Sequence, residues 1–556
     1  MAKKTTQPSR PAAQSSDNSD FNWQTWLPPL LAFALFSMCL RHEILGIDDH
    51  KATLDNPAVT SFSPFTHLNL GMYAPITWLF YGLAYALGKD SPIFYHLLSL
   101  FAHTANVWLV SRMVQRLSGQ RSVAFWVALL FAVHPIQVES VAWIAGFSTP
   151  LYALFFLLAA NWYLEYAEQP EQKQPYFLAL GAFVLACLSK SAAVTLPLVL
   201  VLFDWWAKRP VFERRRIMAY VPFFALALLF GLLTVWSRHE AGMNMDANGN
   251  NYSVLDRILV VCYTPVLYWG KYLLPLTLNI YYGFEKVNGQ FPWYYWVSPL
   301  VLAGVMYAGW RWRNQARYVW FGLLFFFANL SVMLPFRSMG TFELCADHYN
   351  YLAVIGIFFL LANGIPALME RWPNRAGALR AVVGIWTVAM LVLSVRQIGY
   401  WKDTLSVVSH AIENGSHQNG RLYEARGNAL AKNKDISGAI KDYSKAIEIN
   451  PELWESYKYR GSLYGARKQY DRSVSDLGKY VEKYPENHEQ LFNLGLSLYK
   501  LGHLPEAVKA FNRTLELDPD FERAYAARGN AYMAMGDSAK AELDLREYDR
   551  RKLKEK

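Results

Sequence analysis

Long apolar runs, recurring from Trp26 to Arg396, constrain the fold of this chain more than any other feature. A membrane span needs about 20 mostly apolar residues, and runs of that length are separated here by short polar segments. Because the bilayer core offers no water to backbone N–H and C=O groups, such runs cross it as helices. Beyond Tyr400 the composition is that of a soluble helical protein. The sequence predicts an all-α protein in which a polytopic membrane helix bundle precedes a soluble domain.

About eleven segments are expected to cross the membrane. Nine are single runs of roughly the required length. The segment 175–206 is too long for one span and carries a polar Ser-Lys-Ser triplet at its middle, so it is expected to form two short spans that turn at Lys190. The nine single runs are 24–45, 92–111, 122–138, 150–167, 217–236, 294–310, 318–336, 349–368 and 379–396.

The basic residues set the orientation of these spans. Despite a net charge of +10, no nucleic-acid partner is expected, because Lys and Arg cluster in four short segments between apolar runs. All four clusters fall on one side if the eleven runs span, and the positive-inside rule makes that side the cytoplasm. This count requires that 72–88 and 258–276 lie in or dip into the outer interface. The clusters are 112–121, 208–216, 311–317 and 371–380.

The chain divides into three parts. Residues 1–22 are polar and rich in Ser, Pro and Gln, which predicts a disordered cytoplasmic tail. Residues 23–398 form the membrane domain, and its first run has no small-residue cleavage site, so we expect an anchor. The four cysteines lie far apart, without metal-site or disulfide-framework spacing.

A period of 34 residues marks the soluble domain, 399–556. Glycines and small residues recur at this interval, where paired helices approach closely, and the pattern is typical of about four tetratricopeptide repeats. Eleven crossings from a cytoplasmic start leave this array on the non-cytoplasmic side. The recurring residues are Gly427, Gly461, Gly495 and Gly529, with Ala439, Ser473, Ala507 and Ala541.

Ionisable residues gather on the non-cytoplasmic face of the predicted bundle. Such groups are costly to keep at a membrane edge without a purpose, so the set favours a polar site. Asp48 and Asp49 stand side by side just after the first run, where a carboxylate pair can act as a general base, a metal ligand or a helix cap. The full set is Asp48, Asp49, His67, His134, Glu139, Lys190, Arg238, His239, Arg337, Asp347 and His348.

Acidic and basic residues together on this face favour chemistry on a membrane-borne phosphate. The cations would hold the anionic leaving group while a carboxylate takes a proton from the nucleophile. The structural alternatives stay open at this point: Asp48 and Asp49 could only cap a helix, and Lys190 could only mark a turn.

Six segments, in order along the chain, resemble those of the transmembrane and tetratricopeptide repeat-containing O-mannosyltransferases, in the C-type glycosyltransferase superfamily. The resemblance covers the whole chain and implies the C-type glycosyltransferase fold in the membrane domain. The segments are IDDHKATLDNPAV, YAPITWLFYGLAYALG, FYHLLSLFAHTANVWLV, LLFAVHPIQVESVAWIAG, LSKSAAVTLPLVLVLFD and LYWGKYLLPLTLNIYYG.

The resemblance implies an inverting glycosyltransferase that moves a sugar from a polyprenyl-phosphate donor to a hydroxyl, most simply Ser or Thr of a protein. It favours Asp48 as the base, with Asp49 positioning the acceptor or binding a metal. A divalent cation is possible but not required, and no cofactor is certain. Lys190 resembles a family lysine that holds the lipid phosphate.

The resemblance assigns the remaining residues to the walls of the site, with two departures. His134 and Glu139 would orient the sugar or the base, beside Asp347 and His67. Relatives usually have arginine where this chain has Phe147, and Glu-Arg where it has Asp347-His348. His348, with Arg238, His239 and Arg337, is expected to supply the missing positive charge. These departures leave the identity of the sugar open.

Three interpretations remain. The first is a protein O-glycosyltransferase whose repeats hold the acceptor. The second transfers the sugar to a lipid or glycan while the repeats recruit an envelope protein. The third is a non-catalytic membrane scaffold in which the carboxylates are structural. We expect a bacterial member in the inner membrane with periplasmic repeats, the alternative being the endoplasmic reticulum membrane with lumenal repeats.

Overall fold

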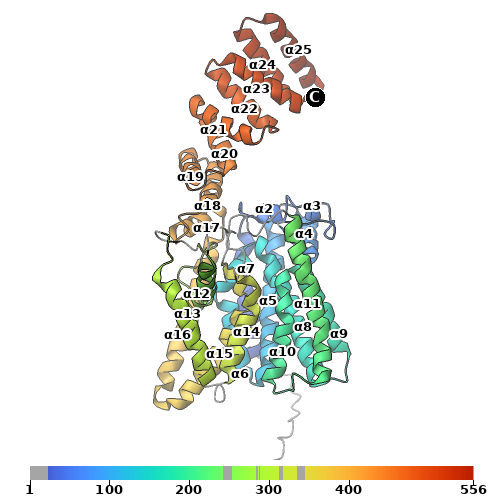
Figure 1. Cartoon of the computed structure of the whole chain (residues 1–556), viewed down its shortest axis with the longest axis vertical. Helices are drawn as coiled ribbons and strands as arrows, with labels where there is room; N and C mark the ends of the chain where they lie inside the picture. Colours follow the sequence, from blue (N-terminus) through green and yellow to red (C-terminus); the bar gives the residue numbers. More distant parts are fainter. Residues whose placement is uncertain are drawn as a thin grey trace, which may run out of the picture.

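The computed structural model describes residues 23–69, 71–241, 253–283, 286, 289–311, 317–334 and 345–554. An upright helix bundle carries an elongated helical array at one end (Figure 1). In the described ranges the only β-type pairing is an isolated bridge between Asn69 and Met72. The prediction of an all-α membrane bundle followed by a tetratricopeptide repeat solenoid is confirmed.

The bundle contains sixteen α-helices among the described residues, and short 3₁₀ turns join several of them. The helices are α1 (Trp23–Phe36), α2 (Asp49–Ala52), α3 (Pro57–Thr60), α4 (Pro75–Gly88), α5 (Pro92–Ser118), α6 (Arg121–Val133), α7 (Val138–Ala142), α8 (Ser148–Glu168), α9 (Gln174–Ser189), α10 (Leu196–Trp206), α11 (Arg214–Glu240), α12 (Val254–Leu273), α13 (Trp293–Arg311), α14 (Arg317–Leu330), α15 (Val354–Arg371) and α16 (Ala376–Tyr400).

The helices long and apolar enough to cross a membrane match the predicted spans closely. Over the described residues there are six, including α5, α11 and α15, and a seventh crossing is possible where α6 and the segment 135–142 meet at a 56° bend. Three shorter apolar helices, 174–189, 191–206 and 317–333, match further predicted spans. The break between the first two falls at Lys190, as predicted. Helix α13 covers the one remaining predicted span, 294–310. It is not among these candidates, so its crossing stays a prediction.

The two segments expected not to cross are both helical. Helix α4 has 14 residues, which at 1.5 Å per residue gives about 21 Å, short of the hydrocarbon core. Helix α12 is longer, but its aromatic contacts lie at the start of α13, the end of α14 and the start of α15, as Tyr263–Tyr295, Trp269–Phe326 and Tyr272–Phe358. These contacts favour a helix that dips into the outer half of the bundle.

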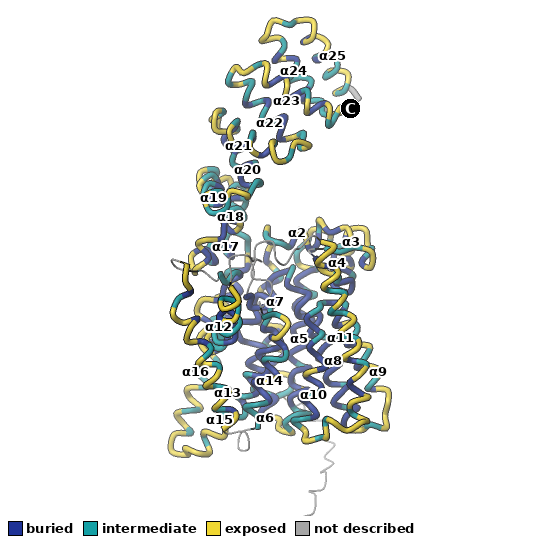
Figure 2. Tube along the Cα trace, viewed as in Figure 1, coloured by how far each residue is buried: buried dark blue, intermediate teal, exposed yellow. Residues whose placement is uncertain are grey.

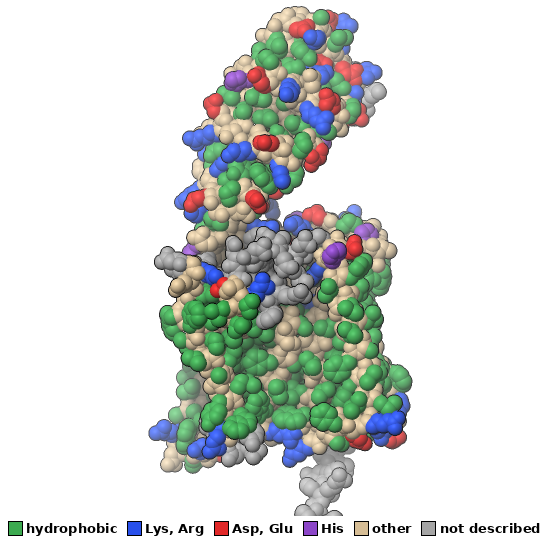
Figure 3. Space-filling model, viewed as in Figure 1, with side chains coloured by type: hydrophobic (Ala, Val, Ile, Leu, Met, Phe, Trp, Pro, Cys, Tyr) green, Lys and Arg blue, Asp and Glu red, His purple; other side chains and the backbone are tan. Residues whose placement is uncertain are grey.

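The flank of the bundle is apolar and its two ends are polar. On the face shown in Figure 3, hydrophobic side chains cover the flank, and Lys and Arg gather at the end opposite the array. Figure 2 shows a buried interior with exposed residues along the outer helices. On α16 the exposed residues include Val382, Ile385, Val388 and Val392, at the spacing of one helix face. This distribution agrees with a lipid-facing surface and with the predicted orientation.

A buried carboxylate joins three helices at the end opposite the array. The Asp204 side chain on α10 is fully buried. It accepts hydrogen bonds from the hydroxyls of Tyr163 and Tyr220, both at 2.6 Å, and pairs with Arg209 and Arg216. With every carboxylate oxygen satisfied, this cluster holds α8, α10 and α11 together away from the candidate site.

The soluble array consists of four helix pairs, each starting 34 residues after the last. Arg426 of α18 pairs with Asp442 of α19 at 2.6 Å, and the same pair recurs as Arg460–Asp476 and Arg528–Asp544. The third repeat has Leu494 and Ala510 at these positions. The helices are α18 (Gly420–Lys432), α19 (Ile436–Ile449), α20 (Trp454–Ala466), α21 (Tyr470–Lys483), α22 (His488–Lys500), α23 (Leu504–Leu517), α24 (Glu522–Ala534) and α25 (Ser538–Lys554).

Helices α14 and α15 touch through two glycines. A Cβ built on Gly322 would lie 2.5 Å from the carbonyl oxygen of Gly356, and one built on Gly356 would meet the Gly322 carbonyl oxygen. Neither backbone oxygen can move without shifting a helix. Small residues are what allow membrane helices to approach this closely.

We predict that Gly356→Ala lowers the thermal unfolding midpoint of the detergent-solubilised protein. The added methyl group has no space, and overpacking of this kind costs about 1–3 kcal/mol. Gly384→Ala on α16 is the matched control, because a Cβ there meets nothing within 4 Å. Equal midpoints for the two variants would contradict the close contact.

Candidate functional site

Asp49 fixes the loop that follows the first span. It is the first residue of α2 and is fully buried. One carboxylate oxygen accepts from the Leu45 N–H and the other from the Ala145 N–H, both at 2.8 Å. A buried carboxylate is stable when donors satisfy both oxygens. Asp49 therefore ties this loop to the turn η3 (Ala145–Phe147).

Asp48 has a different environment, although it is the neighbouring residue. It is half-buried and stands at the N-cap position of α2, but its side chain makes no capping hydrogen bond. Within the described ranges its carboxylate has no hydrogen bond or ion pair. The two carboxylates therefore differ: that of Asp49 holds two backbone N–H groups, and that of Asp48 has no hydrogen-bond partner among the described residues.

A second polar cluster lies between α7 and η6 (Asp347–Asn350). Glu139 on α7 accepts from the Nδ1–H of His348 at 2.8 Å and from the His348 backbone N–H at 3.1 Å. Asp347 accepts a hydrogen bond from the Tyr282 hydroxyl at 2.8 Å. All three members of the Glu139–Asp347–His348 cluster are buried. Burial and the nearby Glu139 charge raise the pKa of Asp347 well above its usual value.

Lys190 approaches this cluster from the break between α9 and α10. Its ammonium donates to the Thr149 hydroxyl at 2.8 Å, and its charge interacts electrostatically with Glu139. The structure thus brings Lys190 together with the predicted residues Glu139, Asp347 and His348.

The segment 139–145 connects the two groups of residues. Glu139 begins it, and the Ala145 N–H that binds Asp49 ends it. Between them, the Trp143 ring lies 6.0 Å from the ring of His348 and 6.0 Å from that of Trp401. The loop with the two aspartates and the Glu139–Asp347–His348 cluster are therefore held by one short stretch of chain.

Other predicted residues have different surroundings. His67 bonds within its own loop, to Ser63 and Thr66. Both ring nitrogens of His134 are used, one accepting from Ile136 N–H and the other donating to the Tyr272 carbonyl. This histidine fixes the bend after α6 and can offer a ligand only its ring faces.

The expected extra cations are not drawn into the described cluster. Arg238 and His239 are exposed in the last turn of α11, and Arg337 lies outside the described residues. Phe147, where relatives usually have arginine, is buried against Phe80 and Tyr81. Among these positions the cluster takes its positive charge from Lys190 and, when protonated, His348.

Two residues that the sequence interpretation missed also face the cluster. Lys271 on α12 interacts electrostatically with Asp347 and donates to the Thr277 hydroxyl at 2.9 Å. Tyr282 donates to Asp347. A lysine inside the apolar run of α12 was the available signal, because a charge at membrane depth is rarely without function.

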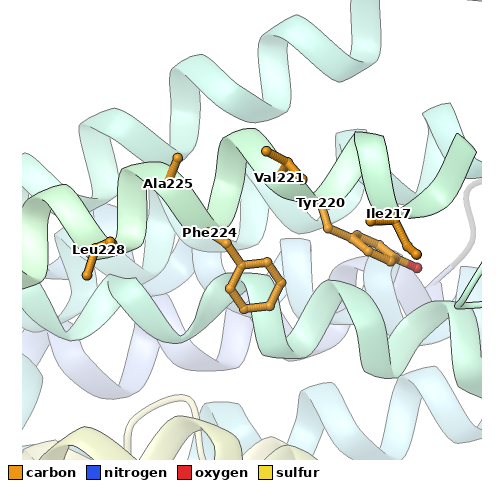
Figure 4. Close-up of a pocket in the computed structure, with 6 residues that line it drawn as sticks. All are labelled: Ile217, Tyr220, Val221, Phe224, Ala225 and Leu228. Atoms are coloured by element: carbon orange, nitrogen blue, oxygen red, sulfur yellow. The ribbon is translucent and has the colours of Figure 1, made fainter. Parts of the chain in front are cut away.

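The described residues offer no metal-ligand group, and the apolar groove along α11 lies away from the polar clusters. Across the described part of the chain, no group of three or more His, Cys, Asp and Glu side chains is arranged to hold a metal ion. A shallow apolar groove of about 360 Å³ runs along α11, from Ile217 to Leu228 (Figure 4). Its lining is apolar apart from Tyr220 and lies on the flank, so it suits a lipid chain better than the chemistry of the polar clusters.

Family models match two parts of the array. One, described as a tetratricopeptide repeat, matches residues 420–453, and another, described as a TPR repeat, matches 495–536. Among solved structures, MamA 41-end from Desulfovibrio magneticus RS-1 is 18% identical, covers 27% of this chain and 84% of that chain, and has a TM-score of 0.26. The repeat assignment rests on the family models and the four helix pairs.

Curated relatives match much more of the chain. Protein O-mannosyl-transferase F38B6.6 of Caenorhabditis elegans is 22% identical over 76% of this chain and 62% of its own length. Protein O-mannosyl-transferase TMTC3 of Mus musculus is 22% identical over 89% and 60%, and TMTC1 of Homo sapiens is 24% identical over 75% and 54%. The chain spans about 60% of the length of the first two. These matches confirm the resemblance on which the sequence interpretation relied.

We predict that Asp49→Asn destabilises the protein and that Asp48→Asn does not. The amide keeps one oxygen, so one of the two backbone N–H groups loses its acceptor, at a cost of about 1–3 kcal/mol. The measurement is the unfolding midpoint in detergent, with Asp48→Asn as the matched control. A similar fall in both variants would contradict the division of roles.

We also predict that stability depends on pH through Asp49. Burial raises the pKa of Asp49 from its usual 3.8 to about 7, although the N–H groups of Leu45 and Ala145 oppose the shift. Between these pKa values the folded protein keeps a proton that the unfolded chain has lost. The contribution of Asp49 to the free energy of unfolding therefore falls as pH rises through this window and then levels off.

The measurement is the midpoint difference between wild type and Asp49→Asn at about pH 5 and about pH 8. The midpoint of wild type should exceed that of Asp49→Asn by more at the lower pH, because the variant lacks the Asp49 carboxyl group that titrates in this window. A pH-independent difference would contradict the raised pKa.

Proposed function

Because the chain is a homologue of the transmembrane and tetratricopeptide repeat-containing O-mannosyltransferases, we propose that it transfers a sugar from a polyprenyl-phosphate donor to a hydroxyl group of a protein. The observation that carries the proposal is the half-buried Asp48 carboxylate, held by its neighbour Asp49 beside a buried cluster with Lys190. Helix α2, which begins at Asp49, lies at the array end of the bundle (Figure 1). We place the reaction there, on the non-cytoplasmic face.

In the proposed reaction Asp48 acts as the general base. Its carboxylate takes the proton of the acceptor hydroxyl as the oxygen attacks the anomeric carbon. The bond between that carbon and the phosphate oxygen breaks, and the lipid phosphate leaves with the electron pair. A single displacement inverts the configuration. Asp49 has no direct part, since both its oxygens hold backbone N–H groups.

Lys190 and His348 would stabilise the charge that develops on the leaving phosphate. A lysine ammonium is a compact cation suited to phosphate. Glu139 accepts from His348 Nδ1–H at 2.8 Å, which holds the ring in place. His348 would thus serve as a hydrogen-bond donor to the phosphate where relatives usually have arginine. Preorganised charges of this kind act where charge appears in the transition state.

The array supplies the reason for choosing a protein acceptor. Stacked helix pairs form an extended surface that can hold a peptide segment. The array leaves the bundle at the end where α2, the helix that directly follows Asp48, lies (Figure 1). We further propose that the protein lies in a bacterial inner membrane with the array in the periplasm.

We predict that purified wild type labels an envelope protein from one member of a panel of synthetic polyprenyl-phosphate sugars, and that Asp48→Asn is folded but inactive. Loss of a general base costs about 10²–10⁴-fold in rate. Asp55→Asn is the matched control, because Asp55 is an exposed carboxylate on the same loop. The measurement is radiolabel in protein and in lipid fractions.

The outcomes separate the competing functions. Label found only in lipid or glycan would favour another acceptor. If Asp48→Asn transfers sugar as fast as wild type, then Asp48 is not the base. If wild type transfers no sugar from any donor, the result favours the non-catalytic scaffold interpretation.

A further inference from the structure

Helix α17 (Thr404–Glu413) lies between the bundle and the repeats but is built into the bundle (Figure 1). Its apolar face, Val407, Val408, Ala411 and Ile412, is buried in the core cluster of the membrane domain. It also packs on α18, the first helix of the array. The helix is therefore a shared element of the two domains and not a free linker.

The N-terminal end of α17 contacts the loop that carries the aspartates. Gly46 N–H donates to the Thr404 hydroxyl at 2.8 Å, and Glu43 N–H donates to the Lys402 carbonyl at 3.0 Å. Asp403 caps the helix by accepting from Ser406 N–H at 2.7 Å, which fixes where Thr404 stands. The contact to Gly46 comes two residues before Asp48.

The C-terminal end of α17 contacts the loop that carries Tyr282. His410 donates to the Leu278 carbonyl at 3.0 Å. The Asn279 amide donates to the Ala411 carbonyl at 3.2 Å and to the Ser416 hydroxyl at 3.1 Å. Three residues after Asn279, Tyr282 donates to Asp347 of the buried cluster. One helix thus holds both segments that reach the candidate site.

We propose that Thr404, the first residue of α17, is a positioning residue for Asp48. The aspartate loop is fixed at one side by Asp49 and at the other by Thr404. Without the Thr404 hydroxyl, Gly46 N–H has no partner on α17 and the backbone before Asp48 gains freedom. The inference rests on the proposed function for its effect on catalysis, but the contact itself can be measured without activity.

The test compares Thr404→Val, which keeps the shape and removes the hydroxyl, with Thr404→Ser, which keeps the hydroxyl. Hydrogen exchange is measured on residues 43–49 in the full-length protein in detergent. Loss of one hydrogen bond should raise exchange of the Gly46 amide about five- to tenfold in Thr404→Val, and Thr404→Ser should match wild type. Thr404→Ala is the second variant if Thr404→Val does not fold.

In the transfer assay, kcat of Thr404→Val should fall about tenfold or more, because a misplaced base reacts slowly. KM for the donor should stay unchanged, since Thr404 does not contact the Lys190 cluster, and Thr404→Ser should restore kcat. Unchanged exchange in Thr404→Val, or a Thr404→Ser variant as impaired as Thr404→Val, would overturn the proposal.

The two proposals fail in different ways. If wild type transfers no sugar, the proposed function fails, while the exchange data still decide whether Thr404 holds the loop. If exchange rises in Thr404→Val but kcat stays at the wild-type value, the contact exists and its role in positioning Asp48 is wrong.

Discussion

Two hydrogen bonds to one buried carboxylate link the aspartate loop to the chain segment that carries Glu139. Asp49 accepts from Leu45 in its own loop and from Ala145, which lies 96 residues away in the chain. Ala145 ends the segment that starts with Glu139. If Asp49 were removed, the aspartate loop and the buried cluster would lose their direct link.

The sequence predicted the architecture well because the architecture follows from periodicity. Runs of about 20 apolar residues have few alternatives to membrane helices, and the helix break at Lys190 was visible as a polar triplet in an apolar segment. The 34-residue period predicted about four helix pairs, since each pair must bury the same face against its neighbours, and the structure has four pairs that start 34 residues apart. The crossing of α13 was predicted from the same pattern and remains a prediction.

The roles of individual residues were harder to predict, because the partners are often backbone groups. Nothing in the spacing of Asp48 and Asp49 reveals that Asp49 meets two backbone N–H groups, one of them 96 residues away, and that Asp48 meets none among the described residues. The role of His134 could not be predicted for the same reason, since its partners are the Ile136 N–H and the Tyr272 carbonyl. Thr404 was missed for a different reason, because it is an ordinary residue at the start of a helix and only tertiary packing brings it to Gly46. Lys271 stood out as a charge inside an apolar run, but its approach to Asp347 is again a tertiary contact.

Burial governs the acid–base behaviour of the Glu139–Asp347–His348 cluster. It raises the pKa of Asp347 well above its usual value, and the nearby Glu139 charge adds to the shift. Burial also raises the pKa of Glu139, although the His348 and Asp347 N–H groups and the Lys190 charge oppose that shift. The charge of Lys271 opposes the shift of Asp347 in the same way. Two carboxyl groups that resist ionisation beside two lysines carry less negative charge than their number suggests, and this is the physical basis for proposing that the cluster receives an anion.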